Sequence, residues 1–145
     1  MTDAIKTPWH LWVVGGLSLL WNVFPAIDFT LTTLRSDFWL SQYTPEQLAF
    51  VVGAPAWSNI CWALGGFGSL LGSVLLLARS RHAVTAFLIS AVGLLGVTYY
   101  QLVQNGAKLK ELLGDVPLYF TVTIWVILLA LIIYTRAMKK RGVLR

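Results

Sequence analysis

The chain has 145 residues, a typical length for one domain, but its composition is not that of a soluble protein. It is 57% hydrophobic and 12% charged, about half the usual charged fraction, with a mean hydropathy of +0.72. Every Lys, Arg, Asp and Glu lies outside four uncharged runs, 7–27, 47–78, 82–107 and 116–135. Each run reaches roughly the 20 residues that span a bilayer. These features exclude an ordinary soluble domain and predict an integral membrane protein.

The excess of basic residues and the single cysteine exclude further classes of function. The sequence pI of about 9.7 would suggest nucleic-acid binding in a soluble domain, but here the basic residues flank the apolar runs and serve to set membrane orientation. We therefore expect membrane lipids as partners and no nucleic acid. Cys61 is the single cysteine, which excludes an internal disulfide and paired-thiol chemistry.

The first predicted span covers about 9–34, and we interpret it as retained, because bulky Phe24 occupies the position where signal cleavage needs a small residue. Pro25 predicts a kink near its end. Residues 35–46 form a loop. Thr44, Pro45 and Gln47 then carry a helix-start pattern.

The 47–78 run is too long for one perpendicular span. We expect Pro55 to divide it into a short interfacial helix at about 45–53 and a span at about 55–78. Residues 79–82 predict a tight turn, so the second and third spans should be antiparallel neighbours.

The third span is predicted over about 83–103, and Asn105-Gly106 should end it. A short polar connector follows up to Pro117, and the fourth span covers about 117–137. The predicted fold is an all-α integral membrane bundle of four transmembrane helices in a single domain, 1–145, with a short interfacial helix before the second span.

Lysine and arginine counts predict the orientation. With both termini cytoplasmic, eight of these residues lie inside and three outside, as the positive-inside rule favours. The three outer residues are Arg35, Lys108 and Lys110.

Small residues mark two helix faces for close packing. The second span carries Gly65, Gly68, Ser69 and Gly72, and the third carries Gly93 and Gly96. We expect these faces to pack neighbouring helices within the chain. The alternative is a seam between copies in a homo-oligomer or a larger membrane complex.

Polar residues from all four spans fall at one depth, near the predicted outer side. The candidate ligand-binding residues are Asp28, Asn22, Asn59, Tyr99, Tyr100 and Gln101. Polar groups inside a bundle are costly unless paired or wetted, so their common depth predicts an outward-facing polar cavity. The alternative is that they only contact headgroups and cap helices. Asp28 is the key candidate, and Arg35, seven residues on, is its candidate counter-ion.

The sequence gives little support for a cofactor site, a metal site or a catalytic site. His10 and His82 both flank the membrane on the predicted inner side, so we expect no haem, metal or other cofactor. No Ser/His/Asp or Cys/His set falls on one membrane side, so we expect no catalytic residues and no enzyme. Some aromatic side chains could line an apolar pocket: Trp21, Phe24, Trp57, Trp62, Phe67 and Trp125.

Several short motifs also carry a resemblance: Trp9-His10-Leu11-Trp12, Trp21-Asn22, Asp28, Thr44-Pro45-Glu46-Gln47-Leu48, Pro55-Ala56-Trp57 and Arg141-Gly142-Val143-Leu144-Arg145. With these, nearly the whole chain resembles a small uncharacterised proteobacterial four-helix integral membrane family, often labelled "sugar transporter". The resemblance implies a location in the bacterial inner (cytoplasmic) membrane. It assigns no site residue.

Three functions are compatible with these patterns. The leading hypothesis is an accessory or structural membrane protein that packs through its glycine-rich faces. The second is a transporter or binding protein for a small polar solute, such as a sugar, held around Asp28. The third is a binder of lipid or of an apolar ligand.

Overall fold

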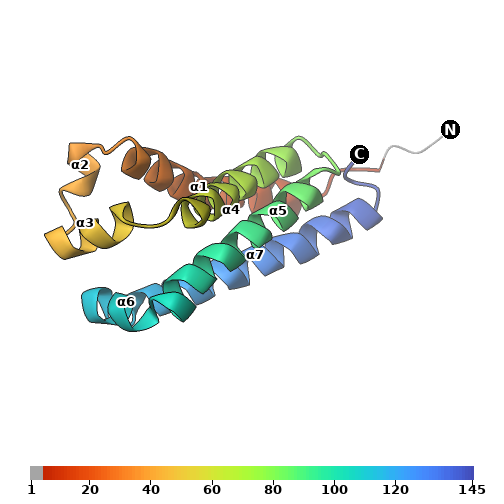
Figure 1. The fold of residues 1–145 in the computed structure, drawn as a ribbon. Coiled ribbons are helices and arrows are strands. Elements are labelled where there is room, and N and C mark those ends of the chain that lie inside the picture. Colours follow the sequence, from red (N-terminus) through yellow and green to blue (C-terminus); the bar gives the residue numbers. More distant parts are fainter. Residues whose placement is uncertain (1–4) are drawn as a thin grey trace.

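The computed structural model describes residues 5–145 as an all-helical bundle (Figure 1). Four helical segments are long and apolar enough to cross a membrane. They are α1 (Trp9–Thr33), α4 (Ala56–Leu77), α5 (Ala83–Thr98) with its continuation η1 (Tyr99–Gln104), and α7 (Val116–Lys140). Three short helices connect them: α2 (Asp37–Leu40), α3 (Pro45–Val52) and α6 (Gly106–Leu113). The predicted all-α membrane bundle is confirmed.

The boundaries of α3 and α4 follow the local sequence signals. Thr44 and Gln47 form a reciprocal capping box, in which the Gln47 amide donates to Thr44 Oγ1 over 3.2 Å and the Thr44 amide donates to Gln47 Oε1 over 3.1 Å. Pro55 is the N-cap of α4, so the 47–78 run is divided where predicted. Proline is common at the start of a helix, because its missing amide hydrogen would have no partner within the helix there.

The segment after the third span differs from the prediction. In place of a polar connector it forms α6, and α5 continues into η1, a π-helix. Leu109, Leu112 and Leu113 repeat at helical spacing in α6 and line the interior, while its lysines are exposed. The charged residues of this segment led to the prediction of a polar connector, although its leucines follow an amphipathic pattern. Asn105 Nδ2 donates to the carbonyl of Tyr100 over 2.9 Å, which supports the wide π turn.

Small residues bring α4 and α5 into close contact. A methyl group on Gly93 would lie 2.5 Å from the Cys61 carbonyl oxygen and the Gly65 amide nitrogen, and one on Gly68 would lie 3.1 Å from the Ser90 amide nitrogen. Ser90 Oγ donates to the Gly65 carbonyl over 2.7 Å. Gly72 faces Phe87 and Gly96 faces Cys61. These faces therefore pack inside the chain and are covered there.

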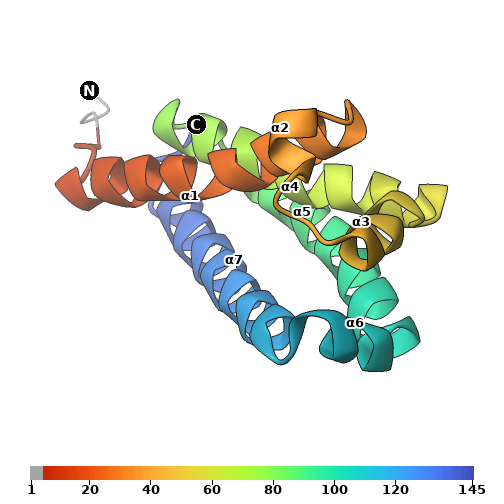
Figure 2. The same cartoon turned by 90° about the vertical axis from the view of Figure 1, so that its left-hand side faces the viewer.

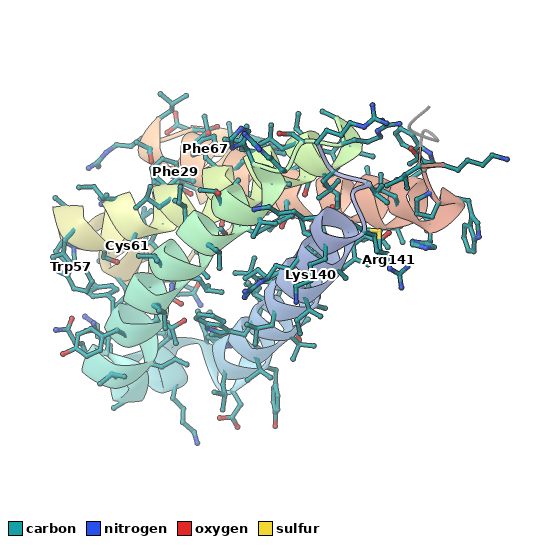
Figure 3. The ribbon with its side chains drawn as sticks, turned by 90° about the vertical axis from the view of Figure 1, so that its right-hand side faces the viewer. Phe29, Trp57, Cys61, Phe67, Lys140 and Arg141 are labelled. Atoms are coloured by element: carbon teal, nitrogen blue, oxygen red, sulfur yellow. The ribbon has the colours of Figure 1, made fainter. Side chains whose placement is uncertain are left out.

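Helix α1 packs along the other side of α4. The ring of Phe29 lies edge-on to those of Trp62 and Phe67, with centroids 5.2 Å and 5.8 Å apart. Figure 3 shows Phe29 and Phe67 next to each other at this seam. On the same pair of helices, Asn22 Nδ2 donates to Ser73 Oγ over 2.9 Å and to the Ser69 carbonyl over 3.3 Å. Hydrogen bonds and aromatic contacts thus join α1 to α4.

Helix α7 packs mainly against α5 and diverges from α1 (Figure 2). Helices α1 and α7 meet at one end of the bundle, where His10 Nδ1 and the Tyr134 hydroxyl are 2.5 Å apart. Toward the other end of the bundle, which holds α2, α3 and α6 and is called the loop end, α1 and α7 separate. This divergence makes room for a cavity among the four long helices.

The opposite end, called the basic end, is closed. The chain after α7 turns back and pairs with the α4–α5 turn, since the Arg145 amide donates to the Arg79 carbonyl over 2.8 Å and the Arg81 amide donates to the Arg145 carbonyl over 2.9 Å. Below this pairing lies a buried apolar cluster of Leu11, Leu76, Ala83, Met138, Val143 and Leu144. Lys140 and Arg141 lie at the adjoining end of α7 (Figure 3).

Candidate ligand cavity

A cavity of about 590 Å³ lies among α1, α4, α5 and α7 toward the loop end. The short helices α3 and α6 complete its wall. Most of its lining is apolar. Seven aromatic side chains contribute to it: Trp21, Phe24, Tyr43, Phe50, Trp62, Tyr100 and Phe120.

Among residues 5–145, Asp28 is the only Asp, Glu, Lys, Arg or His that lines this cavity. Two hydrogen bonds hold its carboxylate, one from Trp39 Nε1 over 2.9 Å and one from Thr32 Oγ1 over 3.4 Å. Both end on Oδ1. Among the described residues no hydrogen bond reaches Oδ2.

Arg35, the expected counter-ion of Asp28, forms no ion pair with it. Within residues 5–145 the one ion pair is Lys110–Asp115, at 3.3 Å on the surface. Helix α1 ends at Thr33, and Arg35 adopts a left-handed backbone with φ 54°. This reversal takes Arg35 off the helical face that carries Asp28, so the prediction of an Asp28–Arg35 pair was wrong.

Tyr43 adds a neutral hydroxyl next to this carboxylate. Burial raises the pKa of the Tyr43 phenol above its ordinary value of 10.0, and the charge of Asp28 raises that pKa further. The phenol therefore keeps its proton at physiological pH and can act as a hydrogen-bond donor to a ligand.

Helix α3 closes the cavity as a lid. Gln47 Nε2 donates to the Leu112 carbonyl of α6 over 3.2 Å. The Phe50 ring stacks on Tyr100 of η1, with centroids 6.0 Å apart, and Lys108 Nζ lies 5.7 Å from the Phe50 centroid. Gln47, Phe50 and Tyr100 also line the cavity, so the groups that hold the lid shut are groups that a ligand would contact.

A side opening, called the portal, lies between α1 and α7. Its residues are Leu20 and Phe24 on α1 and Val116 and Phe120 on α7, which line the cavity and are also exposed. Trp21 and Phe120 approach each other across the gap, with ring centroids 6.2 Å apart. The rim of the portal is therefore apolar on both helices.

The structure brings five of the six sequence-predicted ligand residues to this cavity: Asn22, Asp28, Asn59, Tyr100 and Gln101. Asn22 is buried, and its Nδ2 already bonds α4. Asn59 Nδ2 donates to the Ala54 carbonyl at the start of α4 over 3.4 Å. The side-chain amides of Asn22 and Asn59 thus donate hydrogen bonds within the protein and also line the cavity.

Tyr99 does not line the cavity. It is half exposed and lies against Trp57, with ring centroids 6.5 Å apart. Neighbouring residues on a helix point about 100° apart, so Tyr99 and Tyr100 at one depth face different ways. Of the aromatics proposed for an apolar pocket, Trp21, Phe24 and Trp62 line this cavity, whereas Trp57, Phe67 and Trp125 do not.

Sequence reasoning missed several wall residues. Tyr43, Gln47 and Phe50 come from the loop and α3, which pattern alone placed at the interface, and the leucines of α6 were assigned to a polar connector. The helical spacing of Leu109, Leu112 and Leu113 could have identified that face. Ser58 also lines the cavity, and a single polar residue in an apolar span does not indicate which way it faces. Thr121 lines the cavity as well; the sequence placed it among the polar residues at the common depth but not among the candidate ligand-binding residues.

The histidines lie elsewhere. His10 bonds Tyr134, and His82 is the exposed N-cap of α5. Within the described chain no group of three His, Cys, Asp or Glu side chains could hold a metal ion.

The arrangement suits binding of an apolar molecule with a small polar end. Comparisons with protein-family models, with curated proteins and with solved structures find no match for this chain.

Proposed function

We propose that this small membrane protein binds one amphipathic molecule, with an apolar body and a small polar end, in the cavity at the loop end. The observation that carries the proposal is the cavity of about 590 Å³ with aromatic and aliphatic walls and one carboxylate. Ligand sites typically have volumes of about 300–1,000 Å³, apolar linings and a few placed polar groups. This cavity has all three properties.

The portal supports entry from the bilayer. Leu20 and Val116 are 74% and 70% exposed while lining the cavity, so an apolar molecule could move from lipid into the cavity without crossing a polar surface. The bound molecule would place its body against the aromatic walls and its polar end near Asp28. A sugar, which carries hydroxyl groups all round, would leave many of them against apolar wall.

We propose binding without transport through a single copy. The apolar cluster around Leu11, Leu76 and Met138 closes the basic end, so the cavity has a floor. We also propose that the protein is no enzyme, because the described part of the cavity wall offers one carboxylate and phenols but no histidine, cysteine or lysine.

The charge distribution supports an orientation. The N-terminal segment, the α4–α5 turn and the C-terminal tail meet at the basic end, held together in part by the bond from Arg79 Nη1 to Thr7 Oγ1 over 2.7 Å. We propose that this end faces the cytoplasm and that the protein resides in a bacterial inner membrane. The cavity would then open in the outer half of the bilayer.

A pair of substitutions on α7 tests the binding proposal. Thr121 is buried and lines the cavity, and its neighbour Val122 is exposed and does not. Thr121→Trp should fill the cavity, whereas Val122→Trp should place the same indole in the lipid or detergent layer. The probe is a neutral dansyl fluorophore on a hexyl chain that ends in a tert-butyl group.

Fluorescence anisotropy of this probe with purified protein in detergent should show saturable binding to wild type and to Val122→Trp. Thr121→Trp should weaken binding about tenfold or more, as loss of a well-packed contact site does. Circular dichroism and size-exclusion chromatography check that both variants fold. Equal binding by the two variants, or no saturable binding to wild type, would overturn the proposal.

A further inference from the structure

We propose that the molecule bound in the cavity is an organic cation, an apolar amine or quaternary ammonium compound whose positive charge lies against Asp28. This inference rests on the proposed binding function and names the chemical class of the ligand.

The first argument is charge balance inside the bundle. Of the residues that the structure describes, Asp28 is the only charged side chain in the cavity wall, and none of their cations forms an ion pair with it. An acidic group in a low-dielectric environment is costly unless it is paired or well hydrogen-bonded. A cationic ligand would supply the missing partner, whereas an anionic ligand would meet repulsion there.

The second argument is the geometry of the carboxylate. Trp39 and Thr32 both donate to Oδ1, and these bonds hold the group in one orientation from α2 and from the next turn of α1. The second oxygen, Oδ2, receives no hydrogen bond from the described residues. The fold therefore positions Asp28 and leaves one oxygen for an external group.

The third argument is the aromatic wall. The faces of Trp, Tyr and Phe rings attract cations, most strongly where water is excluded. Trp21 and Trp62 stand on α1 and α4, and Tyr43 and Tyr100 line the side near the lid. An aromatic cavity that contains one carboxylate combines the two groups that recognise a quaternary ammonium ion.

The charge at the loop end supports the same ligand class. The five described Asp and Glu residues all lie there, against three Lys and Arg residues. Glu46 and Glu111 belong to α3 and α6, the helices that cap the cavity. The resulting negative field would attract cations toward the portal.

Three dansyl-hexyl probes test the inference by fluorescence anisotropy. One ends in trimethylammonium, one in its neutral isostere tert-butyl, and one in sulfonate. Wild type should bind the trimethylammonium probe about tenfold more tightly than the tert-butyl probe, since a desolvated cation–aromatic contact and a carboxylate together supply that factor. The sulfonate probe should bind least.

Substitutions then test the role of Asp28. Asp28→Asn keeps an acceptor oxygen for Trp39 and Thr32, so the fold should survive, but the preference for the cation should fall well below tenfold, to the part that the aromatic wall supplies alone. Asp28→Glu should keep the preference. Asp37→Asn is the matched control, because Asp37 is an exposed acid of the same end that does not line the cavity, and it should behave as wild type.

The possible failures are distinguishable. If the tert-butyl probe binds wild type as tightly as the trimethylammonium probe, and Thr121→Trp weakens both, the cavity binds ligands but the cation inference is overturned. If Asp28→Asn folds and retains the preference, the inference is overturned as well. If wild type binds no probe better than Thr121→Trp does, the proposed binding function falls, and the cation inference falls with it. The sulfonate comparison on wild type needs no variant and stands if Asp28→Asn does not fold.

Discussion

Trp39 Nε1 donates a hydrogen bond to Asp28 Oδ1 over 2.9 Å, and this bond ties α2 to α1 at the wall of the cavity. The Trp39 ring also lies against Phe24, with centroids 6.1 Å apart. The short helix α2 therefore has a polar and an apolar attachment to α1. Through them the loop after the first span helps to place the one carboxylate of the cavity.

Trp39→Phe should remove the hydrogen bond and keep much of the ring contact. We expect the free energy of unfolding to fall by about 1.5–3 kcal/mol, the usual net value of a hydrogen bond to a charged group. Thermal unfolding in detergent measures the change. Trp12→Phe is the control, because Trp12 is exposed and lies on α1 away from the cavity. Equal destabilisation by both changes would show that the bond adds nothing.

Two glycine-to-alanine changes should act in opposite directions. A methyl group on Gly93 would lie 2.5 Å from backbone atoms of α4, so Gly93→Ala must push α4 and α5 apart and should cost about 1–3 kcal/mol. Gly16 on α1 has no neighbour within 4 Å of that position, so Gly16→Ala should be neutral or stabilise the helix by up to about 1 kcal/mol. Thermal or SDS-induced unfolding compares them, and an unchanged or higher stability of Gly93→Ala would contradict the close α4–α5 contact.

Phe50→Ala should loosen the lid. It removes the stacking on Tyr100 and the contact with Lys108, while the capping box at Thr44 remains and keeps α3 helical. We expect faster amide hydrogen exchange across α3. Phe38→Ala is the control, because Phe38 is 85% exposed. Unchanged exchange in α3 would mean that the ring does not hold the lid.

Tyr43 should make stability fall at high pH. Its pKa in the folded protein lies above 10.0, so between that value and the higher folded value the unfolded state has released a proton that the folded state keeps. The unfolded state then binds fewer protons, and the free energy of unfolding decreases as pH rises through this range. Below pH 10 the contribution is fully present.

Tyr43→Phe should remove this pH dependence. The measurement is unfolding in detergent between pH 8 and pH 12, with Tyr119→Phe as the control, since Tyr119 is an exposed phenol. A steeper loss of stability in Tyr43→Phe than in wild type would contradict the assignment.

Local signals in the sequence predicted the bundle well. The four spans, the capping box at Thr44 and the division at Pro55 all depend on residues close together in the chain, where apolar run length, side-chain capping and the missing proline amide act directly. Two local features were not predicted: the left-handed turn at Arg35 and the amphipathic helix α6. Both lie in segments whose charged residues suggested loops.

The candidate site was predictable only in part. Depth along a span placed Asn22, Asp28 and Gln101 at one level, because rise per residue is constant in a helix. Facing direction was harder to predict, since it depends on helix phase, and the π-helix after Thr98 changes that phase. Depth alone could not separate Tyr100, which lines the cavity, from its neighbour Tyr99, which does not.

The sequence pattern of this chain, uncharged runs of about 20 residues or more separated by short charged segments, determined by itself that four apolar helices would form, because a continuous apolar run of that length satisfies all its backbone hydrogen bonds within a bilayer as a helix. Whether those helices enclose a solid core or a cavity was decided by tertiary structure. Glycines let α4 and α5 meet closely, whereas α1 and α7 touch at His10 and Tyr134 and then separate. That divergence depends on contacts between residues more than 100 positions apart, and it creates the space around Asp28.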